Sequence, residues 1–219
     1  ATYAPNANYN GDDSFTFSVT DGEYIATADV SVSIAAVNDA PVLAAVSDVS
    51  FDEDGSGDLS LSAGDVDGDD LEFSITGGSD ITATLSGSDV SFSAPENYNG
   101  SETFTVSVTD GELSDSQSIT VTVNAVNDAP TANAAVGETN EDESIVIVLS
   151  GDDVDGDALI FSLDSDATNG TVTLDGALAT YAPNANYNGD DSFTFSVTDG
   201  EYIATADVSV SIAAVNDTP

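Results

Sequence analysis

Lysine, arginine and histidine are absent from this chain of 219 residues, and its 41 acidic residues give it a formal net charge of −41 at pH 7. A protein without cationic side chains has no electrostatic footprint for nucleic acid, since such binding depends on neutralising phosphates. Anionic membrane surfaces are disfavoured for the same reason. The missing lysine also excludes Lys–Asn isopeptide cross-links. Because no acid can form a salt bridge within the chain, solvent salt or bound metal ions have to offset the self-repulsion.

Cysteine is absent as well. The chain therefore has no disulfide framework and no thiol chemistry, which fits an extracellular protein stabilised in another way. Without cysteine and histidine, the usual ligand sets of zinc and copper are also excluded. No apolar run is long enough to span a bilayer, so we expect no membrane span in this segment.

The chain is nevertheless able to bury a core. High net charge often accompanies disorder, but here the hydrophobic content is 40% and apolar residues alternate strictly with polar ones. The alternation is clearest in residues 104–108 and 119–123, where Phe, Val and Ile are separated by Thr and Ser. This pattern predicts a folded protein.

The sequence repeats itself. Residues 1–39 reappear letter for letter as residues 179–217, and an Asn-Asp-Ala-Pro or Asn-Asp-Thr-Pro segment begins at residues 38, 127 and 216, every 89 residues. Repetition at a fixed period indicates that each copy is one structural unit. We therefore divide the chain into the C-terminal half of a repeat (1–39, the N-terminal piece), a complete middle repeat (40–128) and a complete third repeat (129–219). Because the chain opens in mid-unit, we expect a segment of a longer array.

Each complete repeat contains seven short segments of period-two alternation, bounded by Gly, Asp, Asn and Pro. Such segments are typical of half-buried strands, and seven of them in about 90 residues predict an antiparallel sandwich. No segment shows helical periodicity. The predicted fold is all-β, with tandem seven-stranded antiparallel β-sandwiches arranged end to end. The N-terminal piece supplies only the last three strands of a repeat, so its apolar face needs another cover.

Acidic residues gather in loops that this topology brings to the ends of each repeat. Because consecutive strands alternate in direction, successive loops lie at opposite ends of a sandwich. In the middle repeat, the predicted bottom loops and the linker after them contain Glu53, Asp54, Glu102, Asn127 and Asp128. The predicted top loops contain Asp65, Asp67, Asp69 and Asp110. Where repeats follow end to end, the bottom of one and the top of the next bring these groups to one junction.

Calcium suits such a junction, because it takes six to eight oxygen ligands at about 2.3–2.6 Å, whereas magnesium keeps more of its waters. For any single Asp the alternative is a solvated acidic turn, since Asp and Gly are common in turns. The recurrence of the set in every copy favours calcium. An EF-hand is excluded, because the loop that starts at Asp65 has Gly68 at position four rather than six and Thr76 at position twelve.

Together these residues resemble the cadherin-like repeats of giant bacterial surface adhesins, including calcium-dependent RTX-type adhesins. The matching segments are the Glu-Asp turns at 53–54 and 141–142, Asp-Val-Asp-Gly-Asp at 65–69 and 153–157, Pro-Asn-Ala-Asn-Tyr-Asn-Gly at 5–11 and 183–189, Val-Thr-Asp-Gly-Glu at 19–23, 108–112 and 197–201, and the Asn-Asp-Ala-Pro linker. The resemblance covers the whole chain. It implies Ig-like sandwiches, calcium at the junctions, an extracellular cell-surface location, and an extender role between a cell anchor and a distal binding domain.

Carried onto this sequence, the resemblance implies two ligand sets. The junction before the middle repeat would use Asp12, Asp13, Asn38, Asp39, Asp65, Asp67, Asp69 and Asp110. The junction between the middle and third repeats would use Glu53, Asp54, Glu102, Asn127, Asp128, Asp153, Asp155, Asp157 and Asp199. The third repeat has its own early pair at Glu141 and Asp142.

The function predicted from these features is structural and adhesive: a calcium-rigidified extender segment of a long bacterial cell-surface adhesin or extracellular filament. Its partners would be neighbouring repeats of the chain and, in a filament, identical chains. The alternative is a carbohydrate- or protein-binding Ig-like module of a secreted protein, with Tyr98 and Tyr187 as the candidate contact residues. A Tyr at this place more often packs back as a corner, with its hydroxyl bonded to backbone.

We expect no enzymatic activity, because no pair of carboxylates is singled out for glycoside hydrolysis. Adaptation to high salt is a further explanation of the acid load. It predicts acids on strand faces as well as in loops, whereas most acids of this chain lie in loops.

Overall fold

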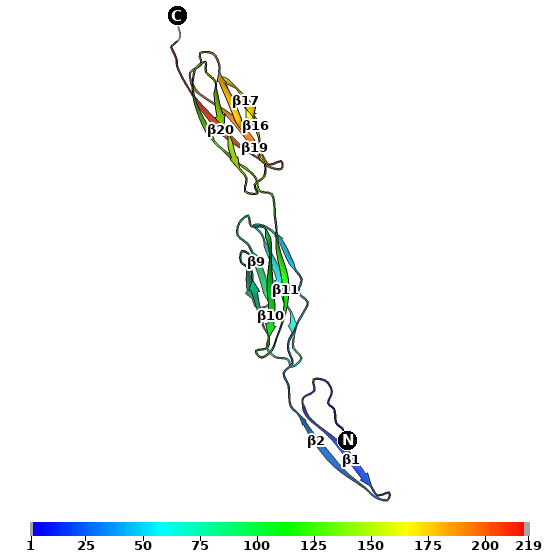
Figure 1. Cartoon of the computed structure of the whole chain (residues 1–219). Helices are drawn as coiled ribbons and strands as arrows, with labels where there is room; N and C mark the ends of the chain where they lie inside the picture. The colour runs from blue at the N-terminus through cyan, green and yellow to red at the C-terminus, as the bar shows by residue number, and fades with distance from the viewer. Residues whose placement is uncertain (1, 217–219) are drawn as a thin grey trace. The chain divides into compact units, whose positions relative to one another are not determined.

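A computed structural model describes residues 2–216, and all the regular structure in this part of the chain is β-strand. The predicted all-β class is confirmed. Contacts divide the chain into two compact units, Ala1–Ala125 and Val126–Pro219, and each is described by itself (Figure 1). Within the described residues, no helix is long and apolar enough to cross a membrane.

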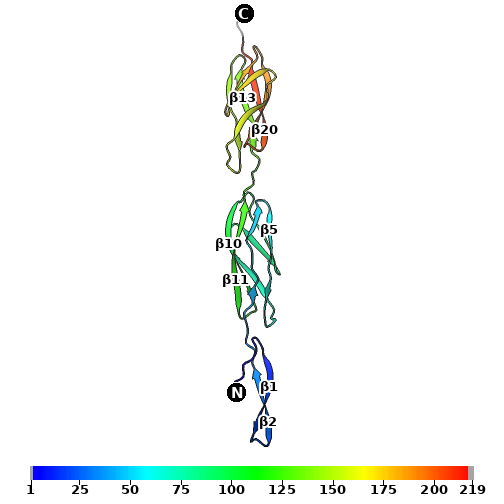
Figure 2. The ribbon, with the colours of Figure 1, turned by 90° about the vertical axis from the view of Figure 1, so that its right-hand side faces the viewer.

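The middle repeat is a sandwich of two sheets. Its strands are β3 (Val42–Leu43), β4 (Val49–Asp52), β5 (Ser56–Ser60), β6 (Ala63–Gly64), β7 (Glu72–Gly77), β8 (Thr82–Ser86), β9 (Asp89–Ser93), β10 (Gly100–Thr109) and β11 (Ser114–Asn124). One sheet has the order β4-β11-β10-β7, the other β5-β9-β8, and β3 pairs with β6. Figure 2 shows β10 and β11 on one side of the repeat and β5 on the other. With β3–β4 and β5–β6 each counted as one interrupted strand, these are the seven predicted strands.

The core of the middle repeat follows from the alternation. On β10, Phe104, Val106 and Val108 are at most 1% exposed, and burying such a side chain contributes roughly 1.5–3 kcal/mol. Phe104 meets Phe92 of the other sheet edge to face, with ring centroids 5.3 Å apart. The buried members of this core are Leu43, Phe51, Leu61, Ile81, Val90, Phe92, Phe104, Val106, Val108, Ile119, Val121 and Val123.

One strand pairing departs from the antiparallel prediction. The strand β4 runs parallel to β11, whereas β3, just before it, pairs antiparallel with β6. The chain therefore crosses from one sheet to the other between β3 and β4. Gln117 of β11 holds this crossing, because its side-chain oxygen accepts the Val46 N–H at 3.0 Å and its amide donates to the Leu43 and Ala44 carbonyls, each at 3.1 Å.

The third repeat has the same plan. Its strands are β12 (Thr131–Asn133), β13 (Ala135–Asn140), β14 (Ile145–Val148), β15 (Ser150–Asp152), β16 (Ile160–Ser165), β17 (Gly170–Asp175), β18 (Leu178–Pro183), β19 (Gly189–Thr198) and β20 (Ile203–Ala213). The sheet orders are β13-β20-β19-β16 and β14-β18-β17, with β12 paired to β15 and β13 parallel to β20. Its separate core contains Ile147, Leu149, Val172, Ala179, Tyr181, Phe193, Phe195, Val197, Val208, Val210 and Ile212.

The N-terminal piece forms a single hairpin of β1 (Gly11–Thr20) and β2 (Ile25–Ile34). Its ladder pairs Gly11 with Ile34, as Gly189 pairs with Ile212 in the third repeat. The first of its three predicted strands is absent from residues 2–10. The identical residues of the third repeat complete β18 by pairing with β14 and β17, and the described residues of the N-terminal piece contain no such neighbours.

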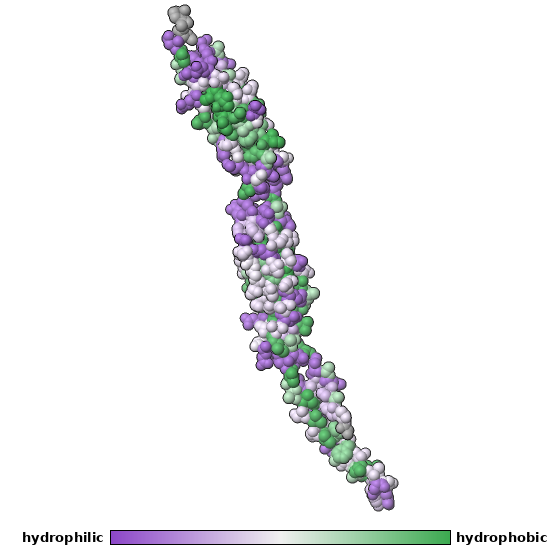
Figure 3. All heavy atoms as spheres, viewed as in Figure 1, coloured by the Kyte–Doolittle hydropathy of each residue, from purple (hydrophilic) through white to green (hydrophobic). Residues whose placement is uncertain are grey.

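The same apolar residues are therefore exposed in the hairpin and buried in the third repeat. Phe17 is 51% exposed where Phe195 is 0% exposed, and Val19 is 63% exposed where Val197 is 0% exposed. Apolar residues are visible along the surface of β1 and β2 (Figure 3). Identical sequence thus meets two different environments within one chain.

Candidate metal centre

Three carboxylates of the middle repeat converge in the loop after β6. One oxygen each from Asp65, Asp67 and Asp69 lies within 4.8 Å of the other two. The loop is turned by Asp65, whose Oδ1 accepts the backbone N–H groups of Asp67 at 2.8 Å and Gly68 at 3.1 Å. Gly68 has φ of +83°, a left-handed conformation that glycine adopts without steric cost. In this loop, the turn around Asp65 brings the three carboxylates of the Asp-x-Asp-Gly-Asp segment together.

The linker before the middle repeat is hydrogen-bonded to this loop and to the β10–β11 turn. The backbone N–H of Asp39 donates to Asp67 Oδ2 at 2.8 Å, and the Asn38 side-chain amide donates to Asp110 Oδ2 at 2.9 Å. The other oxygen of Asp110 accepts two N–H groups of its own turn, those of Glu112 and Leu113, both at 2.7 Å. These bonds, that of Leu113 first and that of Asn38 next, hold the pKa of Asp110 below its usual range.

The third repeat makes the same two linker contacts. The backbone N–H of Asp128 donates to Asp155 Oδ2 at 2.7 Å, and the Asn127 amide donates to Asp199 Oδ2 at 2.8 Å. Burial of Asp199 opposes ionisation, but the bonds from Asn127 and from its own turn outweigh it and lower its pKa. Sequence reasoning placed these loops and linkers together, and within each unit the structure brings them together.

The two loops differ in one respect. In the third repeat, the N–H groups of Asp155 and Asp157 both donate to Asp153 Oδ1, at 3.0 and 3.1 Å. The compact group of three carboxylates is formed around Asp65, and in the described part of the chain it is not repeated around Asp153.

Each loop contains a buried carboxylate oxygen that lacks a hydrogen-bond donor, Oδ2 of Asp65 and Oδ2 of Asp153. A buried charged oxygen without a donor is costly. Beside it, burial and then the charges of Asp65 and Asp67 raise the pKa of Asp69. The chain has no cationic side chain to offset this concentration of charge. Carboxylate and amide oxygens without nitrogen or sulfur ligands are the donor set that Ca²⁺ prefers, so these residues fit that ion.

The early glutamates lie near the opposite end of each sandwich, where they were predicted. Glu53 and Glu141 are only 6% and 7% exposed. Glu141 accepts a hydrogen bond from the backbone N–H of Val215, which belongs to the segment after β20. Its other oxygen accepts a long hydrogen bond, of 3.4 Å, from the Asn188 side chain.

The next acid of each pair stabilises a loop. Asp54 Oδ1 accepts the backbone N–H of Asn97, and Asp142 Oδ1 accepts that of Asn186, both at 3.0 Å. Both acids have φ near +60°, a conformation that Asp tolerates better than most residues. One oxygen of each is thus engaged in fixing the segment before β10 or β19.

Glu102 belongs to β10 and not to the loop that was predicted for it, and its side chain lies beside the connection between β7 and β8. Its two oxygens accept hydrogen bonds from the Ser79 hydroxyl at 2.6 Å and from the backbone N–H groups of Ser79, Ile81 and Asp80, at 2.9–3.1 Å. These bonds, that of the Ser79 hydroxyl first, lower the pKa of Glu102 to about 2. Sequence reasoning missed this role, because the partners lie more than 20 residues away along the chain.

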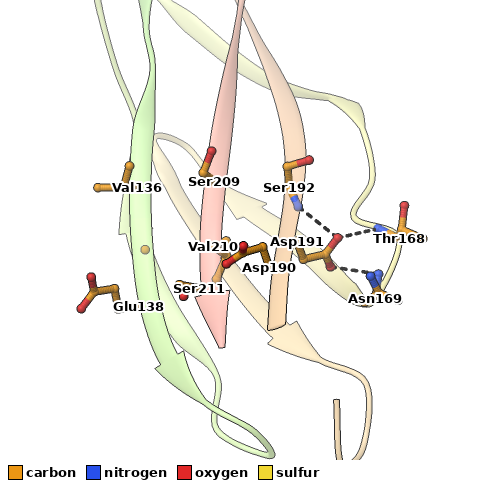
Figure 4. A pocket seen from close by; sticks show the side chains of 11 residues that line it. Val136, Glu138, Thr168, Asn169, Asp190, Asp191, Ser192, Ser209, Val210 and Ser211 are labelled. Atoms are coloured by element: carbon orange, nitrogen blue, oxygen red, sulfur yellow. Dashed lines mark hydrogen bonds between the residues drawn. The ribbon is translucent and has the colours of Figure 1, made fainter. Parts of the chain in front are cut away.

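Asp191 has the corresponding role in the third repeat. It is 9% exposed, and its carboxylate accepts the Thr168, Asn169 and Ser192 backbone N–H groups beside an open hollow on the outer face of β13, β20 and β19 (Figure 4). The Tyr181 hydroxyl also donates to it, at 2.9 Å. Burial and this bond raise the pKa of Tyr181.

The corresponding acids of the N-terminal piece are Asp12 and Asp13. Asp13 accepts the Tyr3 hydroxyl at 2.7 Å, and this bond is the main cause that raises the pKa of Tyr3 to about 12. The Asp12 carbonyl accepts the Tyr9 hydroxyl at 2.8 Å. In the third repeat, the Tyr187 hydroxyl donates to the Asp190 carbonyl at the same distance. The corner interpretation of this tyrosine is confirmed for Tyr187, which argues against its use as a contact residue.

The substitution Glu102→Gln is expected to lower the stability of the middle repeat at neutral pH by about 1–2 kcal/mol, because an amide cannot accept all four hydrogen bonds. A carboxyl whose pKa is depressed in the folded state contributes stability above its unfolded pKa and loses it as the pH falls through the folded pKa. The difference between the two proteins should therefore shrink from about pH 4.5 to about pH 2. Urea unfolding across this range measures it, with the exposed Glu96→Gln as the control. A constant difference would contradict the assignment.

Comparisons with known proteins agree with this geometry. The profile of the bacterial Ig domain matches residues 38–123 and 127–211, and that of a cadherin-like domain matches residues 1–35. The chain belongs to the bacterial Ig domain family. Bacterial Ig and cadherin-like domains are typically extracellular and non-enzymatic. A search of curated proteins gives no match.

Among solved structures, this bacterial Ig domain chain is similar to the EC1-2 segment of human protocadherin-24. The identity is 19% and the TM-score 0.57, over 83% of this chain and 100% of that one, which shows a shared fold. An endo-fucoidan hydrolase from glycoside hydrolase family 107 matches 97% of this chain at 20% identity and a TM-score of 0.35. This chain spans only 35% of that hydrolase. The likeness is too low to carry an argument about catalysis.

Proposed function

We propose that this chain is an extender segment of a long bacterial cell-surface adhesin or extracellular filament, in which calcium ions stiffen the junctions between Ig-like repeats. The observation that carries the proposal is the repeated linker contact. In both places, a linker Asn donates to the acid of a strand-connecting turn and a linker N–H donates to the central Asp of the Asp-x-Asp-Gly-Asp loop. Because the linker is hydrogen-bonded to the acidic loops, an ion bound by those loops would also restrict the motion of the linker.

The proposed ligands come from the loop, the turn and the linker of each repeat. In the middle repeat they are Asp65, Asp67, Asp69, Asp110 and the oxygens of Asn38 and Asp39. In the third repeat they are Asp153, Asp155, Asp157, Asp199 and the oxygens of Asn127 and Asp128. When bound, calcium would supply positive charge that the chain itself lacks. Glu53, Asp54, Glu141 and Asp142 remain predicted ligands. Asp12, Asp13 and Glu102 are left out of the proposed set, because their hydrogen bonds are to Tyr9, to Tyr3 and Ser14, and to residues 79–81, and not to the loop, turn or linker that supplies the other ligands.

The proposal predicts that Asp67→Asn with Asp155→Asn makes the chain more flexible in calcium without unfolding its sandwiches. Asparagine keeps an acceptor oxygen for the linker N–H but removes the charge that binds the ion. We expect the maximum dimension from small-angle X-ray scattering to decrease, and the spread of lengths in electron micrographs to widen, toward the values of the wild-type chain in chelator.

The matched control is Asp58→Asn with Asp164→Asn, which removes the same charge from exposed strand positions of the same two repeats. It should behave as the wild-type chain does. If the loop variant and the control give the same length distribution as the wild-type chain in calcium, stiffening by these loops is refuted.

A further inference from the structure

The outer face of the β14-β18-β17 sheet in the third repeat carries an exposed apolar patch. On β14, Val146 and Val148 are 56% and 68% exposed, whereas Ile147 between them points into the core and is 5% exposed. Leu178 of β18 pairs with Val148 in the ladder and is 44% exposed. We call Val146, Val148 and Leu178 the Val146 patch.

The middle repeat shows that the fold does not require this patch. In the ladder of the third repeat, Val146 pairs with Thr180 and Val148 with Leu178. The corresponding rungs of the middle repeat pair Asp58 with Ser91 and Ser60 with Asp89. Three apolar residues thus replace two aspartates and a serine at the same outward positions.

In the middle repeat two of these outward residues are hydrogen-bonded to each other. The Ser60 hydroxyl donates to Asp89 Oδ1 at 2.7 Å. The same architecture therefore carries a polar face in one repeat and an apolar face in the next. An apolar face that packing within the sandwich does not explain is a mark of an interaction surface.

We propose that the Val146 patch is a self-association surface, on which the patch of a second copy of this chain docks. The distribution of charge on the chain indicates that the partner is a second copy. The chain carries −41 charges and no cation, so two copies repel one another across most of their surfaces. The two strands that form the patch, Ile145–Val148 and Leu178–Pro183, contain no acidic residue. On β17, the exposed Asp175 pairs with Leu178 in the ladder, so one carboxylate lies at the margin of the patch. Two third repeats can meet over Val146 and Val148 with that carboxylate at the rim.

Association through the middle repeat and binding of a cationic partner are both disfavoured. The same face of the middle repeat would place Asp58 and Asp89 of one copy against those of another, which costs Coulomb energy. A cationic partner would be drawn to the acidic loops instead of this face, where β14 and β18 carry no charged residue. The pairing is therefore specific to the third repeat, and contact of one patch with its own copy gives a two-fold interface.

The area of the patch sets the strength of the association. Three side chains on one face of a three-stranded sheet cover on the order of a few hundred Å², below the roughly 800 Å² per partner of a stable standard interface. The dimer is therefore weak and reversible, and its formation depends on screening of the charge that surrounds the patch.

Sedimentation equilibrium of the full chain tests the proposal, in about 0.5 M NaCl to shorten the Debye length to roughly 4 Å. As the concentration is raised, the weight-average mass of the wild-type chain should rise from 22.1 kDa toward twice that value. The variant Val146→Asp, Val148→Ser and Leu178→Asp carries the residues of the middle repeat and should remain at 22.1 kDa. A wild-type chain that stays monomeric, or a variant that associates like it, overturns the proposal.

The reverse variant tests the same surface without loss of apolar residues. Asp58→Val, Ser60→Val and Asp89→Leu give the middle repeat the residues of the Val146 patch, and this chain should associate more strongly than the wild type. Association no stronger than that of the wild type would contradict the proposal.

The face of β1–β2 that carries Phe17 and Val19 is another exposed apolar surface and needs its own control. Because the proposal places association at the Val146 patch, Phe17→Ser with Val19→Ser should leave the concentration dependence of the mass unchanged. If this variant abolishes association while the Val146-patch variant retains it, the hairpin is the surface that associates and the Val146 patch is not.

Discussion

Withdrawal of calcium by a chelator is expected to lower the unfolding midpoint of the chain by roughly 10–20 °C. An ion present at about 100 times its dissociation constant stabilises the folded state by about 2.7 kcal/mol, and each kcal/mol shifts the midpoint of a domain of 60–100 residues by roughly 4–8 °C. The chain contains seven Tyr and no Trp, so calorimetry or far-ultraviolet circular dichroism is the appropriate measurement.

The effect should be this large because charge is concentrated and uncompensated in the loops. Asp65 and Asp153 each hold a buried oxygen that no protein donor reaches, and desolvation, followed by the charges of the surrounding acids, raises the pKa of Asp69. Magnesium should substitute poorly, since it requires near-octahedral geometry and retains its waters. If sodium chloride at high concentration raises the midpoint as much as calcium does, the acids serve mainly as adaptation to salt, and the calcium proposal fails.

Much of the fold could be predicted from the sequence, because period-two alternation states directly which side chains face inward. The outward and inward positions of β10 were predicted correctly, and Phe104, Val106 and Val108 are buried. The parallel pairing of β4 with β11 could not be predicted in this way. The alternation of apolar and polar residues is the same whether a neighbouring strand runs parallel or antiparallel, so it does not predict the direction of that strand.

The candidate metal site could also be predicted only in part. Residues in one loop, or in loops at one end of a sandwich, could be grouped from topology, and the contacts of Asn38 with Asp110 and of Asp39 with Asp67 agree with that grouping. The role of Glu102, which was predicted to lie in a loop and lies in β10, could not be predicted from the sequence. Its partners at residues 79–81 are defined only once β7 and β8 are positioned beside β10. In the sequence, an acid whose carboxylate accepts hydrogen bonds from several backbone N–H groups looks the same as an acid that binds a metal ion. Only the three-dimensional structure distinguishes the two.

The identity of residues 1–39 and 179–217 allows a prediction in which local sequence is held constant. Phe195→Ala should destabilise the third repeat by about 3–5 kcal/mol, the usual cost of removing a fully buried Phe. Phe195 is 0% exposed, and its ring lies 6.1 Å from that of Phe161, stacked upon it. Phe17→Ala changes the same residue of the same 39-residue segment, but Phe17 is 51% exposed. It should cost about 1 kcal/mol or less.

Urea unfolding followed by circular dichroism measures the difference, and hydrogen exchange assigns each loss to its repeat. The outward-facing pair Ser192→Ala and Ser14→Ala is the control, since both residues are exposed and neither substitution should matter. Equal losses for the two Phe substitutions would mean that the inner face of β1–β2 is covered in solution. Unequal losses would show that the stability of this segment comes from the strands packed against it, because its own sequence and its own ladder are the same in both places.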